Sequence, residues 1–111
     1  MLEDSPVDAE IIRRFLTKEQ LDFQFSLATN KPAFILALEQ FKPDLILADN
    51  SLPQFNGSEA LQILRETYKD IPFILVTGSM TDEFAADIIK SGADDYILKD
   101  RLTRLPDAIE A

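Results

Sequence analysis

The residues of this sequence that could do chemistry follow short apolar runs. Asp49, Thr77 and Lys99 each come directly after such a run, and the acidic pair Glu3 and Asp4 follows the first two residues. Three carboxylates brought close together repel one another unless a cation lies among them, and Mg²⁺ prefers oxygen ligands of this kind. A hydroxyl and an ammonium beside them can bind phosphoryl oxygens. These residue types therefore predict magnesium-dependent phosphoryl chemistry, provided that the fold brings them together.

The elements that must position these residues alternate between short strand-like runs and longer stretches with helical spacing. This alternation predicts an α/β domain, a doubly wound parallel sheet with helices on both faces. Met1 and Leu2 are expected to end a first strand, and the further expected strands cover 23–27, 45–48, 71–76 and 95–98. Three of the expected helices are capped by Ser5, Asn30 and Thr81. Two others begin at Ser58 and near Thr103. In such a sheet, ligands bind beyond the carboxyl ends of the strands, where the polar residues above are found.

Composition bounds the function further. With 111 residues the chain is expected to form one domain over 1–111. We also expect the domain to be longer at both ends, because the first strand has only two residues and a helical pattern stops at Ala111. A net charge of -9 opposes direct binding of nucleic acid. The acidic start is unlike a signal peptide and no apolar run approaches ~18 residues, so we expect a cytoplasmic domain without a membrane segment.

Each candidate residue also has an ordinary structural interpretation. A loop aspartate such as Asp49 is most often a helix cap or a solvated acid, but the next predicted helix begins too far along the chain, at Ser58, for Asp49 to cap it. Glu3 and Asp4 fit the acidic first turn of a helix equally well, and Lys99 alone would be a surface charge. Only their joint position after the strands favours a shared site.

The motifs made by these residues resemble the receiver domain of two-component response regulators along nearly the whole chain. They are the pair Glu3-Asp4, the D-x-x-x-P pattern from Asp49 to Pro53 with Gly57 beyond it, Thr77-Gly78, and the Y-x-x-K pattern from Tyr96 to Lys99. The resemblance implies a flavodoxin-like fold with a five-stranded parallel sheet in the order 2-1-3-4-5.

The resemblance also implies roles for single residues. Asp49 would be the nucleophile that accepts a phosphoryl group from a phosphohistidine. Asp4 and Asp49 would bind Mg²⁺ directly, Glu3 through water, and Ser51 through its main-chain carbonyl. Thr77 and Lys99 would hold the phosphoryl oxygens.

A conformational switch and several partners are implied in the same way. Tyr96 would change rotamer as Thr77 moves toward the phosphate. The partners would be a sensor histidine kinase or histidine phosphotransfer domain, docking on the first helix near Ile12, Leu16 and Arg13-Arg14, and an output domain or protein. Dimerisation would use the face of the fourth helix, fifth strand and fifth helix. The domain would catalyse only its own phosphorylation and dephosphorylation and would not be an enzyme otherwise.

Departures from the family pattern lead to specific expectations. Glu3 stands where many members have Asp. Lys99 is followed by Asp100 where proline is frequent, so we expect a trans bond, because a cis bond before a non-proline residue costs about 2.5 to 4 kcal/mol. Ser51 and Ser79 occupy the two positions that in this family tune the lifetime of the phosphoryl group.

Two alternatives remain open at this point. The first is a pseudo-receiver, a protein-interaction module of the same fold that is never phosphorylated. The second is a free-standing enzyme of flavodoxin-like fold, either a flavin protein or a phosphatase with an aspartyl nucleophile. The acidic segment after the first strand would repel a flavin phosphate, and Ser51 stands where an aspartyl phosphatase has its second acid.

Overall fold

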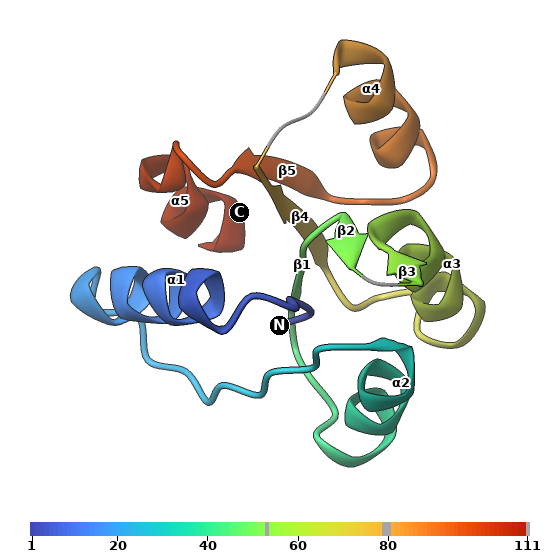
Figure 1. Cartoon of the computed structure of the whole chain (residues 1–111), viewed down its shortest axis with the longest axis horizontal. Coiled ribbons are helices and arrows are strands. Elements are labelled where there is room, and N and C mark those ends of the chain that lie inside the picture. Colours follow the sequence, from blue (N-terminus) through green and yellow to red (C-terminus); the bar gives the residue numbers. More distant parts are fainter. Residues whose placement is uncertain (53, 79–80, 111) are drawn as a thin grey trace.

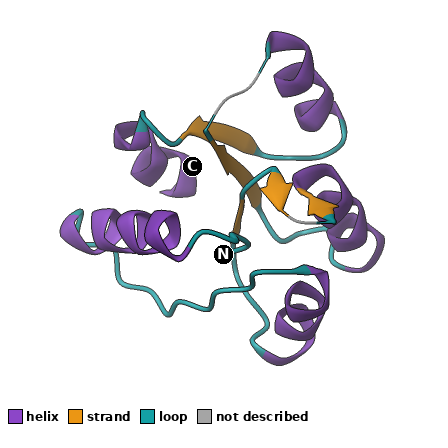
Figure 2. Ribbon diagram, viewed as in Figure 1, coloured by secondary structure: helices purple, strands orange, loops and turns teal. Residues whose placement is uncertain are grey.

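The computed structural model describes residues 1–52, 54–78 and 81–110. The chain folds into helices arranged around a central parallel sheet (Figure 1, Figure 2). The elements are α1 (Pro6–Lys18), α2 (Lys31–Gln40), β1 (Ile46–Ala48), β2 (Ser51–Leu52), β3 (Phe55–Asn56), α3 (Gly57–Thr67), β4 (Phe73–Thr77), α4 (Asp82–Lys90), β5 (Asp95–Leu98), a 3-10 turn (Leu102–Arg104) and α5 (Leu105–Glu110). Within the described residues, none of these helices combines the length and the apolar character that crossing a membrane requires.

The sheet has the expected parallel order. β1, β4 and β5 pair in that order, with both pairs of strands parallel. Two further extended segments continue the sheet beyond β1, because Leu2 forms parallel bridges with Ala48 on one side and with Ala28 on the other. The spatial order Ala28, Leu2, β1, β4, β5 is the order 2-1-3-4-5, which confirms the predicted flavodoxin-like topology.

The predicted strand over 23–27 is not formed as a strand. Pairing begins only at the end of the segment. The Met1 ammonium donates to the Ser26 carbonyl at 2.7 Å, the Ala28 N–H donates to the Met1 carbonyl at 2.8 Å, and the Glu3 N–H donates to the Ala28 carbonyl at 2.9 Å. A strand needs a neighbour that satisfies its backbone groups, and here the neighbour is the short stretch from Met1 to Glu3. Residues 23–27, whose alternating pattern predicted a strand, therefore form a loop.

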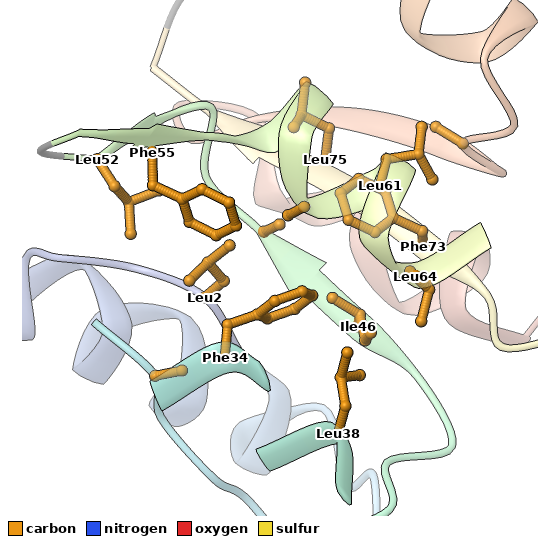
Figure 3. Packing of buried hydrophobic residues seen from close by; sticks show 14 of the residues in the cluster. Leu2, Phe34, Leu38, Ile46, Leu52, Phe55, Leu61, Leu64, Phe73 and Leu75 are labelled. Atoms are coloured by element: carbon orange, nitrogen blue, oxygen red, sulfur yellow. The ribbon is translucent and has the colours of Figure 1, made fainter. Parts of the chain in front are cut away.

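Helices cover both faces of the sheet, as predicted. Figure 1 shows α1 and α5 on one side of the sheet and α2, α3 and α4 on the other. Ile46 and Phe73 pack with the helices of the second group (Figure 3), while Leu47 and Ile74 pack against α1 and α5. Successive residues of a strand point to opposite faces, so a sheet covered twice needs strands that are apolar throughout. This is the reason that β1 and the first four residues of β4, residues 73–76, are uninterrupted apolar runs.

The three predicted helix caps are confirmed. The side chains of Ser5, Asn30 and Thr81 accept hydrogen bonds from backbone N–H groups in the first turns of α1, α2 and α4, at 3.2, 2.9 and 3.1 Å. Each bond satisfies one of the donors that a helix leaves unpaired at its start. The polar caps therefore fix the starting points of these helices, including that of α1 just beyond the acidic pair.

The start of α3 differs from the prediction. The helix begins at Gly57 and not at Ser58, and its cap is Asn56, whose side chain accepts from the Glu59 N–H at 2.8 Å. A short antiparallel hairpin, β2 and β3, precedes it, with Leu52 opposite Phe55. The two strands of this hairpin thus lie between Asp49 and the start of α3.

The expected docking role of Ile12 and Leu16 on α1 is wrong. Their exposed fractions are 1% and 4%, because both side chains pack against the sheet and α5. The apolar residues of α1 cover a wider part of the helix surface than the part that packs against the sheet. Val7 and Ile11 are the exposed apolar residues of this helix, at 68% and 52%.

Candidate functional site

The predicted site residues come together at one edge of the sheet. Glu3 and Asp4 follow the bridge at Leu2, Asp49 follows β1, Thr77 ends β4 and Lys99 follows β5. The segments are tied to one another through the backbone. The Asp49 N–H donates to the Leu2 carbonyl at 2.9 Å, and the Lys99 N–H donates to the Thr77 carbonyl at 2.8 Å. The convergence expected from parallel strands is therefore observed.

The acidic part of the site consists of Glu3, Asp4 and Asp49. One carboxylate oxygen of each lies within 4.8 Å of the others. Their environments differ, because Glu3 has no exposed surface, Asp49 is 6% exposed and Asp4 is exposed. Burial raises the pKa of Glu3, against the opposing effect of its contacts with Lys99 and Ser5. The cluster joins two buried carboxyl groups to one that faces water.

These carboxylates suit a hard divalent cation. Oxygen ligands from one or two carboxylates, completed by water and phosphate oxygens, are the usual environment of protein-bound Mg²⁺. Apart from its ion pair with Lys99, Glu3 Oε1 has no hydrogen-bond donor among the described residues. A buried oxygen of this kind is a natural acceptor for a water molecule held by a cation. The donor set therefore fits the metal that the sequence predicts.

Asp49 is held in a defined orientation. Its Oδ1 accepts a hydrogen bond from the Asn50 N–H at 2.8 Å, and its Oδ2 lies 3.5 Å from Lys99 Nζ. The carbonyl of Asn50 accepts from the Gly57 N–H at 3.1 Å, which ties the loop to the start of α3. Asp49 therefore has no capping role, and one of its oxygens faces the site.

Lys99 is the cation of the site. Its Nζ lies 2.6 Å from Glu3 Oε1 and 2.8 Å from Asp8 Oδ2, both nearer than Asp49. Burial lowers the pKa of Lys99, but the contacts with Asp8, Glu3 and Asp49 outweigh it, so this pKa lies above its usual value. The described residues include no cis peptide bond, so the Lys99-Asp100 bond is trans, as expected.

Asp8 is the site residue that the sequence did not single out. It lies in the first turn of α1, and its side chain hydrogen-bonds to Lys99, 91 residues further along the chain. An acidic residue in a first helical turn is common because of the helix dipole, so its type alone carried no signal. Only the placement of α1 against the end of β5 shows the contact.

Thr77 and Tyr96 differ in their surroundings. Thr77 is 5% exposed and ends β4, while Tyr96 is 36% exposed and lies opposite Leu75 in the pairing of β4 with β5. The Tyr96 carbonyl accepts a hydrogen bond from the Arg104 guanidinium, which links β5 to the turn before α5. Thr77 is thus part of the buried edge, and the switch role of Tyr96 stays a prediction.

The loop residues of the predicted site are described only in part. Ser51 begins β2, and its backbone pairs with Asn56. Pro53 of the D-x-x-x-P pattern and Ser79 lie outside the described residues. The metal-binding role of the Ser51 carbonyl, and the roles of Ser51 and Ser79 in setting the lifetime of the phosphoryl group, therefore stay predictions.

Comparisons with known proteins identify the family of this chain. The family model described as response regulator receiver domain matches residues 1–110. The regulatory protein LuxO of Vibrio cholerae serotype O1 is 30% identical over 99 residues, which cover 89% of this chain and 21% of LuxO. The probable C4-dicarboxylate response regulator DctR of Bacillus subtilis is 28% identical over 111 residues, or 99% of this chain and 49% of DctR. The chain thus spans about a fifth to a half of these relatives.

Solved structures show the same fold. The BeF3-activated N-terminal receiver domain of Klebsiella pneumoniae RstA has a TM-score of 0.84 at 28% identity, with 98% of this chain and 91% of that chain covered. The signal receiver domain of a LuxO repressor protein from Vibrio parahaemolyticus has a TM-score of 0.86 at 24% identity, with 98% and 83% covered.

Proposed function

This chain belongs to the family of response regulator receiver domains, and from that premise we propose that Asp49 is the residue that accepts the phosphoryl group. The observation that carries this assignment is the setting of its carboxylate. Asn50 fixes one oxygen, Lys99 faces the other, and the oxygens of Glu3 and Asp4 lie within 4.8 Å. Asp49 is therefore a buried carboxylate with a cationic group and two further carboxylates beside it, and it keeps a small exposed surface that Glu3 lacks.

The proposed reaction is a transfer from a phosphohistidine of a partner. A carboxylate oxygen of Asp49 forms a bond to phosphorus while the bond from phosphorus to the imidazole nitrogen breaks, and the imidazole leaves with that electron pair. The chain contains no histidine, so the donor imidazole belongs to a histidine kinase or a histidine phosphotransfer domain. The domain itself would catalyse only its own phosphorylation and dephosphorylation.

The acidic residues would hold Mg²⁺ for this reaction. Asp4 and Asp49 are the proposed direct ligands, with the main-chain carbonyl of Ser51. Glu3 suits an indirect role through water, because its Oε2 accepts from the Ser5 N–H at 3.2 Å and its Oε1 pairs with Lys99. When bound, the cation would offset the negative charge of the phosphoryl oxygens.

Thr77 and Lys99 would bind the remaining phosphoryl oxygens. A buried hydroxyl at the end of β4 and an ammonium after β5 are supplied by separate strands, so they can approach a group on Asp49 from different sides. Movement of Thr77 toward that group would be accompanied by the rotamer change of Tyr96. The surface of α4, β5 and α5 would then carry the signal and serve as a dimer interface.

The partners of the whole protein are part of the same proposal. Because the chain spans only part of its relatives, the output domain or partner protein and the cytoplasmic location are inferred from the family. For the kinase, Val7 and Ile11 offer the exposed apolar surface of α1. Arg13 and Arg14 both pair with Glu10 on the same helix.

A small phosphodonor tests the assignment without the kinase. Incubation with acetyl phosphate and Mg²⁺ should add one phosphoryl group to the intact protein, measured by mass spectrometry, and Asp49→Asn should abolish the addition. Asp100→Asn, the same change at an exposed position next to Lys99, is the matched control and should be labelled normally. Labelling that survives in Asp49→Asn would overturn the assignment, and no labelling of the unaltered protein would favour a pseudo-receiver.

A further inference from the structure

Asp8 holds the ammonium group that the proposed chemistry needs. Lys99 Nζ donates a hydrogen bond to Asp8 Oδ2 at 2.8 Å, whereas its distance to Asp49 Oδ2 is 3.5 Å. The ammonium is thus engaged by Asp8 and Glu3 while Asp49 is unmodified. A phosphoryl group on Asp49 would have to compete with these carboxylates for the same donors.

Asp8 is placed for this contact by the start of α1. Its backbone N–H donates to the Ser5 cap at 3.2 Å, so its main chain is fixed relative to the acidic edge of the sheet. The carboxylate also lies at the positive end of the helix dipole, which stabilises its charge whether or not Lys99 is near. Asp8 can therefore release Lys99 without leaving its charge unsupported.

The two partners of Lys99 differ in their access to water. The side chain of Asp8 is 39% exposed, while that of Glu3 has no exposed surface. Separating a charge pair is favourable only where water or other donors replace the lost contact. Asp8 can return to water and Glu3 cannot, so Asp8 is the partner that Lys99 can exchange for a phosphoryl oxygen.

We propose that Asp8 is a positioning residue that competes with the phosphoryl group for Lys99. In the unmodified domain the Asp8 carboxylate binds the ammonium, and when Asp49 carries a phosphoryl group the ammonium passes to a phosphoryl oxygen. Asp8 then faces solvent. This inference rests on the proposed role of Asp49. Its consequence is that Asp8 weakens the binding of an anionic phosphoryl group and so limits the population of the activated state.

Beryllium fluoride, BeF3⁻, is a suitable probe because it binds an aspartate as a phosphoryl analogue without a chemical step. We would measure its apparent affinity in the presence of Mg²⁺ by fluorine NMR. Asp8→Asn removes the competing charge and should bind the probe about two- to fivefold more tightly, the range expected for a partly exposed ion pair. Asp8→Glu keeps the charge and should stay near the unaltered protein.

The control for a general effect of charge is Asp100→Asn. It removes the same charge from an exposed residue next to Lys99 in sequence, and it should shift the affinity less than Asp8→Asn. Asp8→Ser provides a second uncharged variant should Asp8→Asn fold poorly, and the same tightening is expected of it.

The NMR signal of the Lys99 ammonium gives a second readout. Without BeF3⁻, Asp8→Asn should shift this signal relative to the unaltered protein, because the contact is lost. With BeF3⁻ bound, the two proteins should give the same signal, because the ammonium has left Asp8 in both. If Asp8 had only a structural role, the Lys99 signals of Asp8→Asn and of the unaltered protein would still differ after BeF3⁻ binds.

The outcomes separate this inference from the proposed function. Equal or weaker probe binding by both uncharged Asp8 variants, or a Lys99 signal that still differs after the probe binds, would overturn the competition. Absence of probe binding by the unaltered protein, or binding that persists in Asp49→Asn, would instead overturn the assignment of Asp49 and the inference with it.

Discussion

Lys99 Nζ lies 2.6 Å from Oε1 of Glu3, a carboxylate without exposed surface. The pair links two distant parts of the chain, since Glu3 follows the first extended segment and Lys99 follows β5. A buried carboxylate depends on such a partner, because removing the ammonium would leave the charge of Glu3 buried and uncompensated. The same ammonium thus supports the fold and takes part in the proposed chemistry.

The first prediction concerns pH and Glu3. Burial raises the pKa of Glu3 above its ordinary value of 4.5, so the folded state holds the proton of this carboxyl group more tightly than the unfolded chain does. The stabilisation that comes from this tighter proton binding by Glu3 is fully present below pH 4.5, and it is lost as the pH rises through the raised pKa. The stability of Glu3→Gln relative to the unaltered protein should therefore increase with pH across that window.

Urea unfolding in EDTA, from about pH 4 to about pH 8, measures this difference. Glu39→Gln, the same change at an exposed position of α2, is the control and should show a flat difference. If the free energy of unfolding of Glu3→Gln, relative to that of the unaltered protein, stayed constant or fell with pH, the raised pKa of Glu3 would be contradicted.

The second prediction concerns Mg²⁺ and the acidic cluster. A cation that binds only the folded state stabilises it by about 1.4 kcal/mol at ten times its dissociation constant. Adding Mg²⁺ should therefore raise the thermal unfolding temperature of the unaltered protein, and Asp4→Asn should remove most of this increase. Asp100→Asn should respond as the unaltered protein does. Equal increases in Asp4→Asn and the unaltered protein would exclude Asp4 as a ligand.

The third prediction concerns the hydroxyl of Thr77. Because this buried donor is expected to bind a phosphoryl oxygen, Thr77→Ala should slow phosphorylation by acetyl phosphate about tenfold or more. Thr77→Ser keeps the hydroxyl and should recover most of the rate. Initial rates measured by mass spectrometry distinguish the two variants, and equal rates in both would show that the hydroxyl is not used.

The fourth prediction concerns the close packing behind Asp49. A Cβ atom on Gly57 would lie 2.6 Å from Leu75 Cδ1 and 3.3 Å from the Asp49 carbonyl oxygen. Overpacking of this kind costs about 1 to 3 kcal/mol, so Gly57→Ala should lower the free energy of unfolding by about 1 kcal/mol after the gain in helix propensity. A Cβ atom on Gly78 would meet no atom of the described residues within 4 Å, so Gly78→Ala serves as the control in the same urea titration. An unchanged stability of Gly57→Ala would show that the Leu75 side chain can move aside without cost.

The sequence predicted the site because strand ends are easily recognised. Asp49, Thr77 and Lys99 each follow an apolar run, and the parallel sheet places the carboxyl ends of such runs at one edge. The caps Ser5 and Asn30 were predictable for a similar reason, since the interaction lies within one turn of the helix.

Tertiary contacts account for what the sequence did not show. Asp8 meets Lys99 only because α1 packs beside the end of β5, and a first-turn acid gives no sign of this. The stripe of α1 did not reveal that Ile12 is buried and Ile11 exposed, because both belong to the same apolar set. The β2–β3 hairpin has strands of two residues each, too short for an alternating pattern to be recognised.

The most direct test of the central claim is to locate the phosphoryl group chemically. Borohydride reduces an aspartyl phosphate to homoserine, so reduction after incubation with acetyl phosphate and Mg²⁺, followed by peptide sequencing by mass spectrometry, identifies the modified residue. We predict homoserine at position 49 alone, and none when Mg²⁺ is replaced by EDTA. Homoserine at Asp4 or at another acid, with Asp49 intact, would contradict the account.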